Sequence, residues 1–127
     1  MKITYAVIWT SKRILETLFM TSKSGQLRRR CKHNVKQMQP FWDDIVEFVN
    51  KDAEENKWEK ADTGFPANPE DMAGFESRFI AFLNSDEEAF EYTPYTFSEE
   101  LMEFADGITG EQENAIAWLF TENQPQN

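Results

Sequence analysis

The cysteine and the histidine of this 127-residue chain, Cys31 and His33, are each the only residue of their kind. A thiol beside an imidazole can act as a nucleophilic pair, and the neighbouring arginines would favour the thiolate. The spacing argues against such a pair, because residues two apart on a helix point about 200° away from each other. We therefore expect a small apolar contact at Cys31 and a solvated side chain at His33. One residue of each kind also excludes a zinc site built from cysteine and histidine alone.

Carboxylates one helical turn apart are the second candidate for chemistry. Asp43 precedes Glu47 by four residues, and Glu99 precedes Glu103 by the same interval. Each pair shares a helix face, where two carboxylates can hold a divalent cation or act as acid and base. None of these acids falls on an apolar face, and the chain contains no calcium-loop, phosphate-loop or nucleophile-elbow motif. The sequence therefore predicts a protein that is not an enzyme and has no metal and no cofactor.

The elements expected around these residues are mostly helical. Residues 2–10 alternate apolar and polar side chains, which is typical of a strand, but no second strong strand follows it. This segment is therefore either a strand that pairs across a dimer or part of a helix. From Ser11, which is available as a helix cap, the apolar spacing becomes helical. A basic helix over residues 26–38 is expected to end at Pro40. Residues 41–56 place apolar and acidic side chains on opposite faces of another helix.

Capping signals divide the rest of the chain. A loop over residues 57–67 leads to Asn68 and Pro69, which mark the start of a core helix. Further helices are expected at capping boxes, where a serine or threonine is followed three residues later by a glutamate or glutamine. The boxes are Ser85 with Glu88, Thr96 with Glu99 and Thr109 with Gln112. The sequence thus predicts a mainly α fold, a compact bundle of five or six helices, with a single N-terminal β-strand as one alternative for residues 2–10.

Charge divides the chain near residue 39. Residues 1–39 carry a net charge of +8 and residues 40–127 carry −18, which together give −10. We therefore expect a basic N-terminal segment, 1–39, packed on or appended to the core, an acidic helical domain, 40–121, and a disordered tail, 122–127. The two charged parts either neutralise each other within the fold or form two surfaces with different partners.

The acidic part offers the strongest functional hypothesis. Carboxylates fixed on helices repel nucleic acid and anionic membranes, and they attract basic proteins, many of which handle nucleic acid. We expect a non-enzymatic inhibitor that occupies the binding surface of such a protein, of the DNA-mimic or anti-defence type. The alternative in the same physical class is an immunity protein or antitoxin that neutralises a cognate toxin. The expected contact residues are Asp43, Asp44, Glu47, Asp52, Glu54, Glu55, Asp86, Glu87, Glu88, Glu91, Glu99, Glu100 and Glu103.

Apolar anchors would have to accompany the acids, since charge supplies rate and specificity more than affinity. Aromatic residues in the expected loops are the candidates: Trp58, Phe65, Tyr92 and Tyr95.

The basic segment supports a different alternative, a nucleic-acid-binding module. Its cations can neutralise several phosphates without reading sequence, although that stretch lacks the aromatic residues that stack on unpaired bases. The residues of this basic patch are Arg28, Arg29, Arg30, Lys32 and Lys36. No stretch is apolar for long enough to cross a membrane, and no secretion signal is recognised, so we expect a cytoplasmic protein without a membrane partner, as a monomer or a homodimer.

Overall fold

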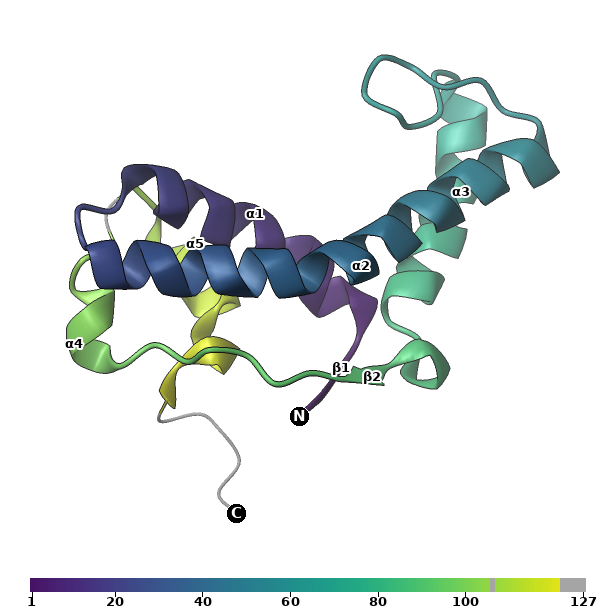
Figure 1. The fold of residues 1–127 in the computed structure, drawn as a ribbon. Coiled ribbons are helices and arrows are strands. Elements are labelled where there is room, and N and C mark those ends of the chain that lie inside the picture. The colour runs from purple at the N-terminus through teal and green to yellow at the C-terminus, as the bar shows by residue number, and fades with distance from the viewer. Residues whose placement is uncertain (106, 122–127) are drawn as a thin grey trace.

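The computed structural model describes residues 1–105 and 107–121, and it shows the helical fold that the sequence predicts (Figure 1). Five α-helices, two short 3₁₀ helices and one two-stranded antiparallel sheet are found in these residues. In chain order the elements are β1 (Lys2–Ile3), α1 (Tyr5–Thr21), α2 (Gly25–Asn56), α3 (Pro69–Leu83), η1 (Asp86–Glu88), β2 (Phe90–Glu91), α4 (Glu99–Met102), α5 (Gly110–Ala115) and η2 (Ala117–Leu119).

The N-terminal segment is mostly helix, with a strand only at its first residues. β1 pairs with β2 of the same chain, Lys2 opposite Glu91 and Ile3 opposite Phe90, so the ladder needs no second chain. From Tyr5 the backbone is already helical, because Ile8, Leu15 and Leu18 recur at helical spacing and are completely buried. The alternation of apolar and polar side chains over residues 2–10 therefore indicates a strand correctly only as far as Ile3.

The expected cap at Ser11 is wrong, since α1 begins six residues earlier. Ser11 is a buried residue inside α1, and its hydroxyl accepts a hydrogen bond from the indole of Trp118 at 2.9 Å. This bond ties the first helix to the end of the described chain.

Pro40 does not end the basic helix, and this is the main correction to the expected fold. α2 runs without interruption for 32 residues and contains Pro40 in its interior. A proline inside a helix costs about 3 kcal/mol because it removes one backbone hydrogen bond and crowds the preceding turn. Met38 and Ile45, on either side of it, are completely buried in the core, and α2 packs against α1. Burying two large apolar side chains contributes about 3 to 6 kcal/mol, which offsets the proline.

The predicted boundary between a basic segment and an acidic domain at residues 39 and 40 falls inside α2. The first half of α2 carries the basic patch and its second half carries acids, so both belong to one uninterrupted helix (Figure 1). The core contains residues from both sides of that boundary, from Ile3 to Leu119. The predicted tail, 122–127, lies outside the described residues.

The loop and the start of α3 follow the sequence signals. Residues 57–67 form the expected loop, with Lys57 in a left-handed conformation directly after α2. Asn68 caps α3 by accepting a hydrogen bond from the amide of Glu70 at 2.8 Å, and Pro69 occupies the first helical position. α3 then crosses the second half of α2 (Figure 1). Phe75 and Phe79 of α3 bury their rings in the core.

The remaining caps were predicted only in part. The box at Thr109 and Gln112 is confirmed, with both of its hydrogen bonds present. Ser85 precedes a single 3₁₀ turn and makes no side-chain cap, so the box with Glu88 is wrong. The cap of α4 is Ser98 and not Thr96, because the chain stays extended through Phe97, which bonds to Leu119 and Thr121.

Candidate functional site

Acids from two distant parts of the sequence meet in a hollow between α2, α3 and η1. Asp44, Glu47 and Glu88 line one part of it, with a volume of about 330 Å³. Glu55 and again Glu88 line the adjoining part, of about 580 Å³. Phe48 and Phe82 line both parts, so we treat them as one feature and call it the acidic groove. The fold creates it because α3 turns into η1 beside the second half of α2 (Figure 1).

Aromatic rings form the floor of the acidic groove. Phe48 of α2 stacks on Phe82 of α3, with ring centroids 4.3 Å apart and planes at 7°. Tyr5 of α1 stacks on the same Phe82 ring at 4.9 Å. Because these rings turn their faces toward one another, they offer a partner apolar area bordered by carboxylates, which suits the aliphatic stems and charged ends of lysine and arginine.

Asp44 is held in place within the groove. The hydroxyl of Tyr5 donates a hydrogen bond of 2.9 Å to the Asp44 carboxylate. Burial raises the pKa of Tyr5 to about 12, and the bond to Asp44 acts in the same direction. Glu47, Glu55 and Glu88 are exposed and make no ion pair with another described residue. The groove therefore presents one carboxylate held by a hydrogen bond and three exposed carboxylates without an ion pair to another described residue.

Two cations reduce the negative charge of the groove. Lys51 lines its smaller part and Arg78 its larger part. Arg78 is already bound to Asp52 through two hydrogen bonds of 2.7 and 2.9 Å. The charge left at the groove is therefore negative.

Asp52 was expected on the acidic surface, and this prediction is wrong. Its side chain is buried, and besides the pair with Arg78 it accepts a hydrogen bond of 2.9 Å from the indole of Trp58. The bond from Arg78 lowers the pKa of Asp52, and the Trp58 bond adds to the effect against the opposing effect of burial. Asp52 therefore joins α2, the following loop and α3.

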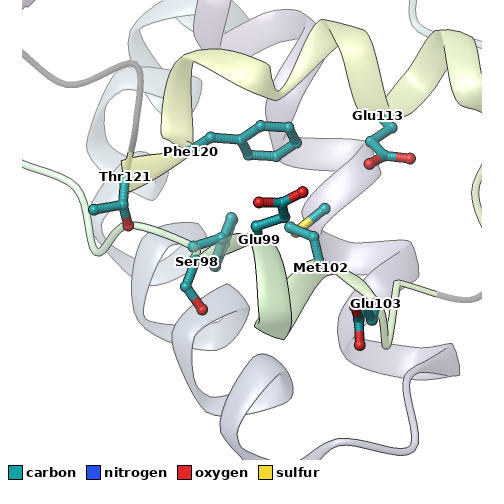
Figure 2. Close-up of a pocket in the computed structure, with 8 residues that line it drawn as sticks. Ser98, Glu99, Met102, Glu103, Glu113, Phe120 and Thr121 are labelled. Carbon is teal, nitrogen blue, oxygen red and sulfur yellow. The ribbon is translucent and has the colours of Figure 1, made fainter.

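A second acidic hollow lies at the other end of the molecule, between α4 and the α5–η2 segment (Figure 2). It has a volume of about 630 Å³, and we call it the acidic cavity. Figure 2 shows Glu99 pointing into it beneath the ring of Phe120, with Glu103 and Glu113 to one side. Sequence reasoning missed Glu113, because only the turn between α4 and α5 brings it opposite Glu99. Lining residues are Phe97, Ser98, Glu99, Met102, Glu103, Glu113, Phe120 and Thr121.

The other predicted acids are exposed but line neither hollow. Asp43 accepts a hydrogen bond from Gln39, and Glu91 lies 3.6 Å from the amino group of Met1. The remaining members of this set are Glu54, Asp86, Glu87 and Glu100. The predicted acids are thus divided between two separate hollows and their margins.

The four predicted anchors differ in burial. Trp58 and Tyr92 are each only 5% exposed, so both are core residues and cannot be surface anchors as expected. Burial raises the pKa of the Tyr92 hydroxyl. Phe65 is half-buried and contacts Trp9 edge-on, with ring centroids 6.1 Å apart. Tyr95 is the one anchor candidate with large exposure, at 48%.

The basic patch stays separate from the acids. Arg28 donates to the carbonyl of Phe19 at 3.0 Å, and Arg30 donates to the carbonyl of Thr96 at 2.8 Å. Arg29, Lys32 and Lys36 are exposed on α2. The ion pairs among described residues are Met1 with Glu91, Lys12 with Glu16, and Arg78 with Asp52. None of them joins the basic patch to an acid.

Cys31 and His33 do not form a pair. Cys31 is completely buried in the core, where desolvation raises its pKa to about 12. His33 is half-buried and stacks on Tyr95, with its Nε2 atom buried without a hydrogen-bond partner, so the expectation of a solvated histidine is wrong. Across residues 1–105 and 107–121, no three His, Cys, Asp or Glu side chains come together as a set of metal ligands.

Comparisons of the chain with models of protein families, with curated proteins and with solved structures found no match. None of the helices in the described part of the chain combines the length and apolar character needed to cross a membrane.

Proposed function

We propose that the acidic groove binds a basic surface of a protein that handles nucleic acid, and that it inhibits this protein by occupying the surface where the nucleic acid binds. The observation that supports this function is the meeting of Asp44 and Glu47 of α2 with Glu88 of η1 over an aromatic floor. Negative charge of this kind speeds association with a cationic partner. The part of the Phe48 and Phe82 rings that a partner covers adds affinity.

Separation of the two charged halves of α2 supports the same proposal. If Arg28 to Lys36 were paired with the acids, the acidic groups would be neutralised within the fold. The pairs found among the described residues leave Glu47, Glu55 and Glu88 open to a partner. Their attraction for a basic protein falls as salt rises, because the groups are exposed to solvent.

The experiment compares two variants that each remove three carboxylates. The groove variant is Asp44→Asn, Glu47→Gln, Glu88→Gln, and the cavity variant is Glu99→Gln, Glu103→Gln, Glu113→Gln. Both change the net charge by the same amount, so any difference between them reports the position of the charge. The full chain and both variants are immobilised, and proteins retained from extracts of the source cells are identified.

We expect the full chain and the cavity variant to retain a basic nucleic-acid-handling protein, and the groove variant to retain it at least about tenfold more weakly. Added duplex DNA or RNA should release the protein from the full chain. Equal retention by all three chains, or a partner that nucleic acid does not displace, would contradict the proposal.

A further inference from the structure

An exposed aromatic ring lies against the basic half of α2. Tyr95, in the extended segment between β2 and α4, stacks on His33 with ring centroids 3.5 Å apart and planes at 10°. Tyr95 keeps 48% of its surface exposed, so it is reachable from solvent although His33 stacks on its ring. The sequence showed no aromatic residue within the basic stretch, and the fold supplies one from a segment far along the chain.

Hydrogen bonds fix the position of this ring. The buried side chain of Asn34 accepts from the amide of Tyr95 at 2.8 Å and donates to its carbonyl at 2.9 Å. Arg30 donates to the next carbonyl, that of Thr96, at 2.8 Å. Hydrogen bonds to the backbone of Tyr95 and Thr96 therefore hold this segment against α2, where the Tyr95 ring is already stacked on His33.

Cations surround the stacked pair. On a helix the neighbours of His33 are the residues three and four positions away, which include Arg29, Arg30 and Lys36. The Arg30 guanidinium lies 5.9 Å from the centroid of the Tyr95 ring. Arg29 and Lys36 are exposed and make no ion pair within the described chain.

None of the ion pairs of the described chain joins these cations to an acid. Asp43 is seven residues beyond Lys36 on α2, about 10 Å along the helix axis, which exceeds the screening length of about 8 Å at physiological salt. Glu91 lies 3.6 Å from the amino group of Met1. Glu99 points into the acidic cavity beneath Phe120 (Figure 2). The basic half of α2 beside Tyr95 therefore carries cations without an acidic partner in the described chain, on a protein with net negative charge.

We propose that Tyr95 and His33, with Arg29, Arg30 and Lys36, form a site for single-stranded nucleic acid. An unpaired base stacks on the exposed part of the Tyr95 ring, and the cations contact the phosphates on either side of it. An exposed aromatic ring among cations is the combination by which proteins bind single strands, and in a duplex the bases are already stacked on each other. An acidic peptide would use the cations alone and would gain nothing from the ring.

The test measures binding of the full chain to a fluorescein-labelled oligothymidylate of about ten nucleotides by fluorescence anisotropy, in about 50 mM salt. A duplex of the same length serves as the second probe. We expect the single strand to bind more tightly than the duplex. Tyr95→Ala should weaken binding about tenfold, while Tyr95→Phe keeps the ring and stays within about twofold of the full chain.

Charge variants separate stacking from attraction. Arg29→Ala with Lys36→Ala should weaken binding and reduce its dependence on salt, while Lys51→Ala, which removes an exposed cation from the other half of α2, should not weaken it. Circular dichroism of each variant confirms that the helices are formed. The groove variant should bind the oligonucleotide at least as tightly as the full chain, so this site and the proposed inhibitory function are tested separately.

Three results would overturn the site. These are the absence of saturable binding to the oligothymidylate, equal affinity of the full chain and Tyr95→Ala, and tighter binding of the duplex than of the single strand. A polyglutamate peptide that binds as tightly as the oligonucleotide, with no effect of Tyr95→Ala, would assign the patch to acidic proteins.

Discussion

The two halves of α2 each hold a distant segment through one buried polar side chain, and the two side chains differ in charge. In the basic half, the neutral Asn34 binds both backbone groups of Tyr95. In the acidic half, the charged Asp52 binds the indole of Trp58 and the guanidinium of Arg78. One long helix thus organises two sides of the fold through similar contacts that respond differently to pH.

The sign of the pH response follows from the Asp52 carboxyl. Its pKa is lowered in the folded protein, chiefly by the bond from Arg78. The pair therefore contributes its full stability above the unfolded value of about 3.9, and the contribution is lost as the pH falls through the lower folded pKa. Asn34 does not titrate, so the attachment of Tyr95 is independent of pH in this range.

The largest expected effect concerns Cys31 in the basic half. Burial raises its pKa to about 12, although arginines nearby in sequence would favour the thiolate. A thiol reagent at about pH 8 should react with the folded chain at least about a thousandfold more slowly than with the chain unfolded in urea. Reaction at the rate of a free thiol would show that Cys31 is exposed and that the packing of α1 on α2 is wrong.

The next largest effect is expected from removing the side chain of Asn34, which holds the backbone of Tyr95. Asn34→Ala removes both side-chain hydrogen bonds and leaves backbone groups of Tyr95 without partners near a buried position. We expect the free energy of unfolding, measured by urea denaturation, to fall by about 3 kcal/mol. The control is Gln37→Ala, an exposed change on the same helix, which should alter the value by less than about 0.5 kcal/mol. Similar effects of the two changes would argue that residues 92–97 are not held by Asn34.

The contribution of Asp52 to the free energy of unfolding should be smaller than that of Asn34 and should depend on pH. Asp52→Asn is expected to lower the free energy of unfolding by about 2 kcal/mol at pH 7, because the partly exposed Arg78 regains water while the Trp58 indole keeps an acceptor. The difference from the unchanged protein should shrink as the pH falls toward about 3. A difference that stays constant from neutral to acid pH would contradict the pairing. Glu55→Gln, an exposed neighbour, is the matched control.

The smallest effects are expected from exposed charges of the two halves. Lys32→Gln and Glu47→Gln should each change the free energy of unfolding by less than about 0.5 kcal/mol, and the double variant should equal their sum. A coupling of about 1 kcal/mol or more would show that the two halves attract each other within the fold.

Much of the fold was predictable because the signals were local. Asn68 and Pro69 at α3, and Thr109 with Gln112 at α5, produced the expected helix starts. Pro40 led to a wrong helix end, because the rule that proline stops a helix was given more weight than the apolar pattern around it. The apolar stripe continues from Met38 to Ile45 at helical spacing. That stripe was present in the sequence and would have predicted the continuous helix.

Less of the candidate site was predictable, because it depends on contacts between distant segments. The exposed acids of α2 follow from its amphipathic pattern, but the meeting of Glu88 with Glu47 depends on how α3 turns into η1. Asp52 was read as exposed because no pattern in the sequence indicates that Arg78 and Trp58 lie beside it. The stack of Tyr95 on His33 likewise joins residues from two separate segments.

The salt dependence of thermal stability distinguishes between two charged halves of α2 that stay separate and two halves that attract each other. Tm is measured by circular dichroism in about 20 mM and about 0.5 M sodium chloride at neutral pH. Each half of α2 carries an excess of charges of one sign, which repel one another, so screening should raise Tm at the higher salt concentration. A Tm that falls as salt is added would mean that the basic patch and the acids stabilise the fold by mutual attraction, and it would contradict the account.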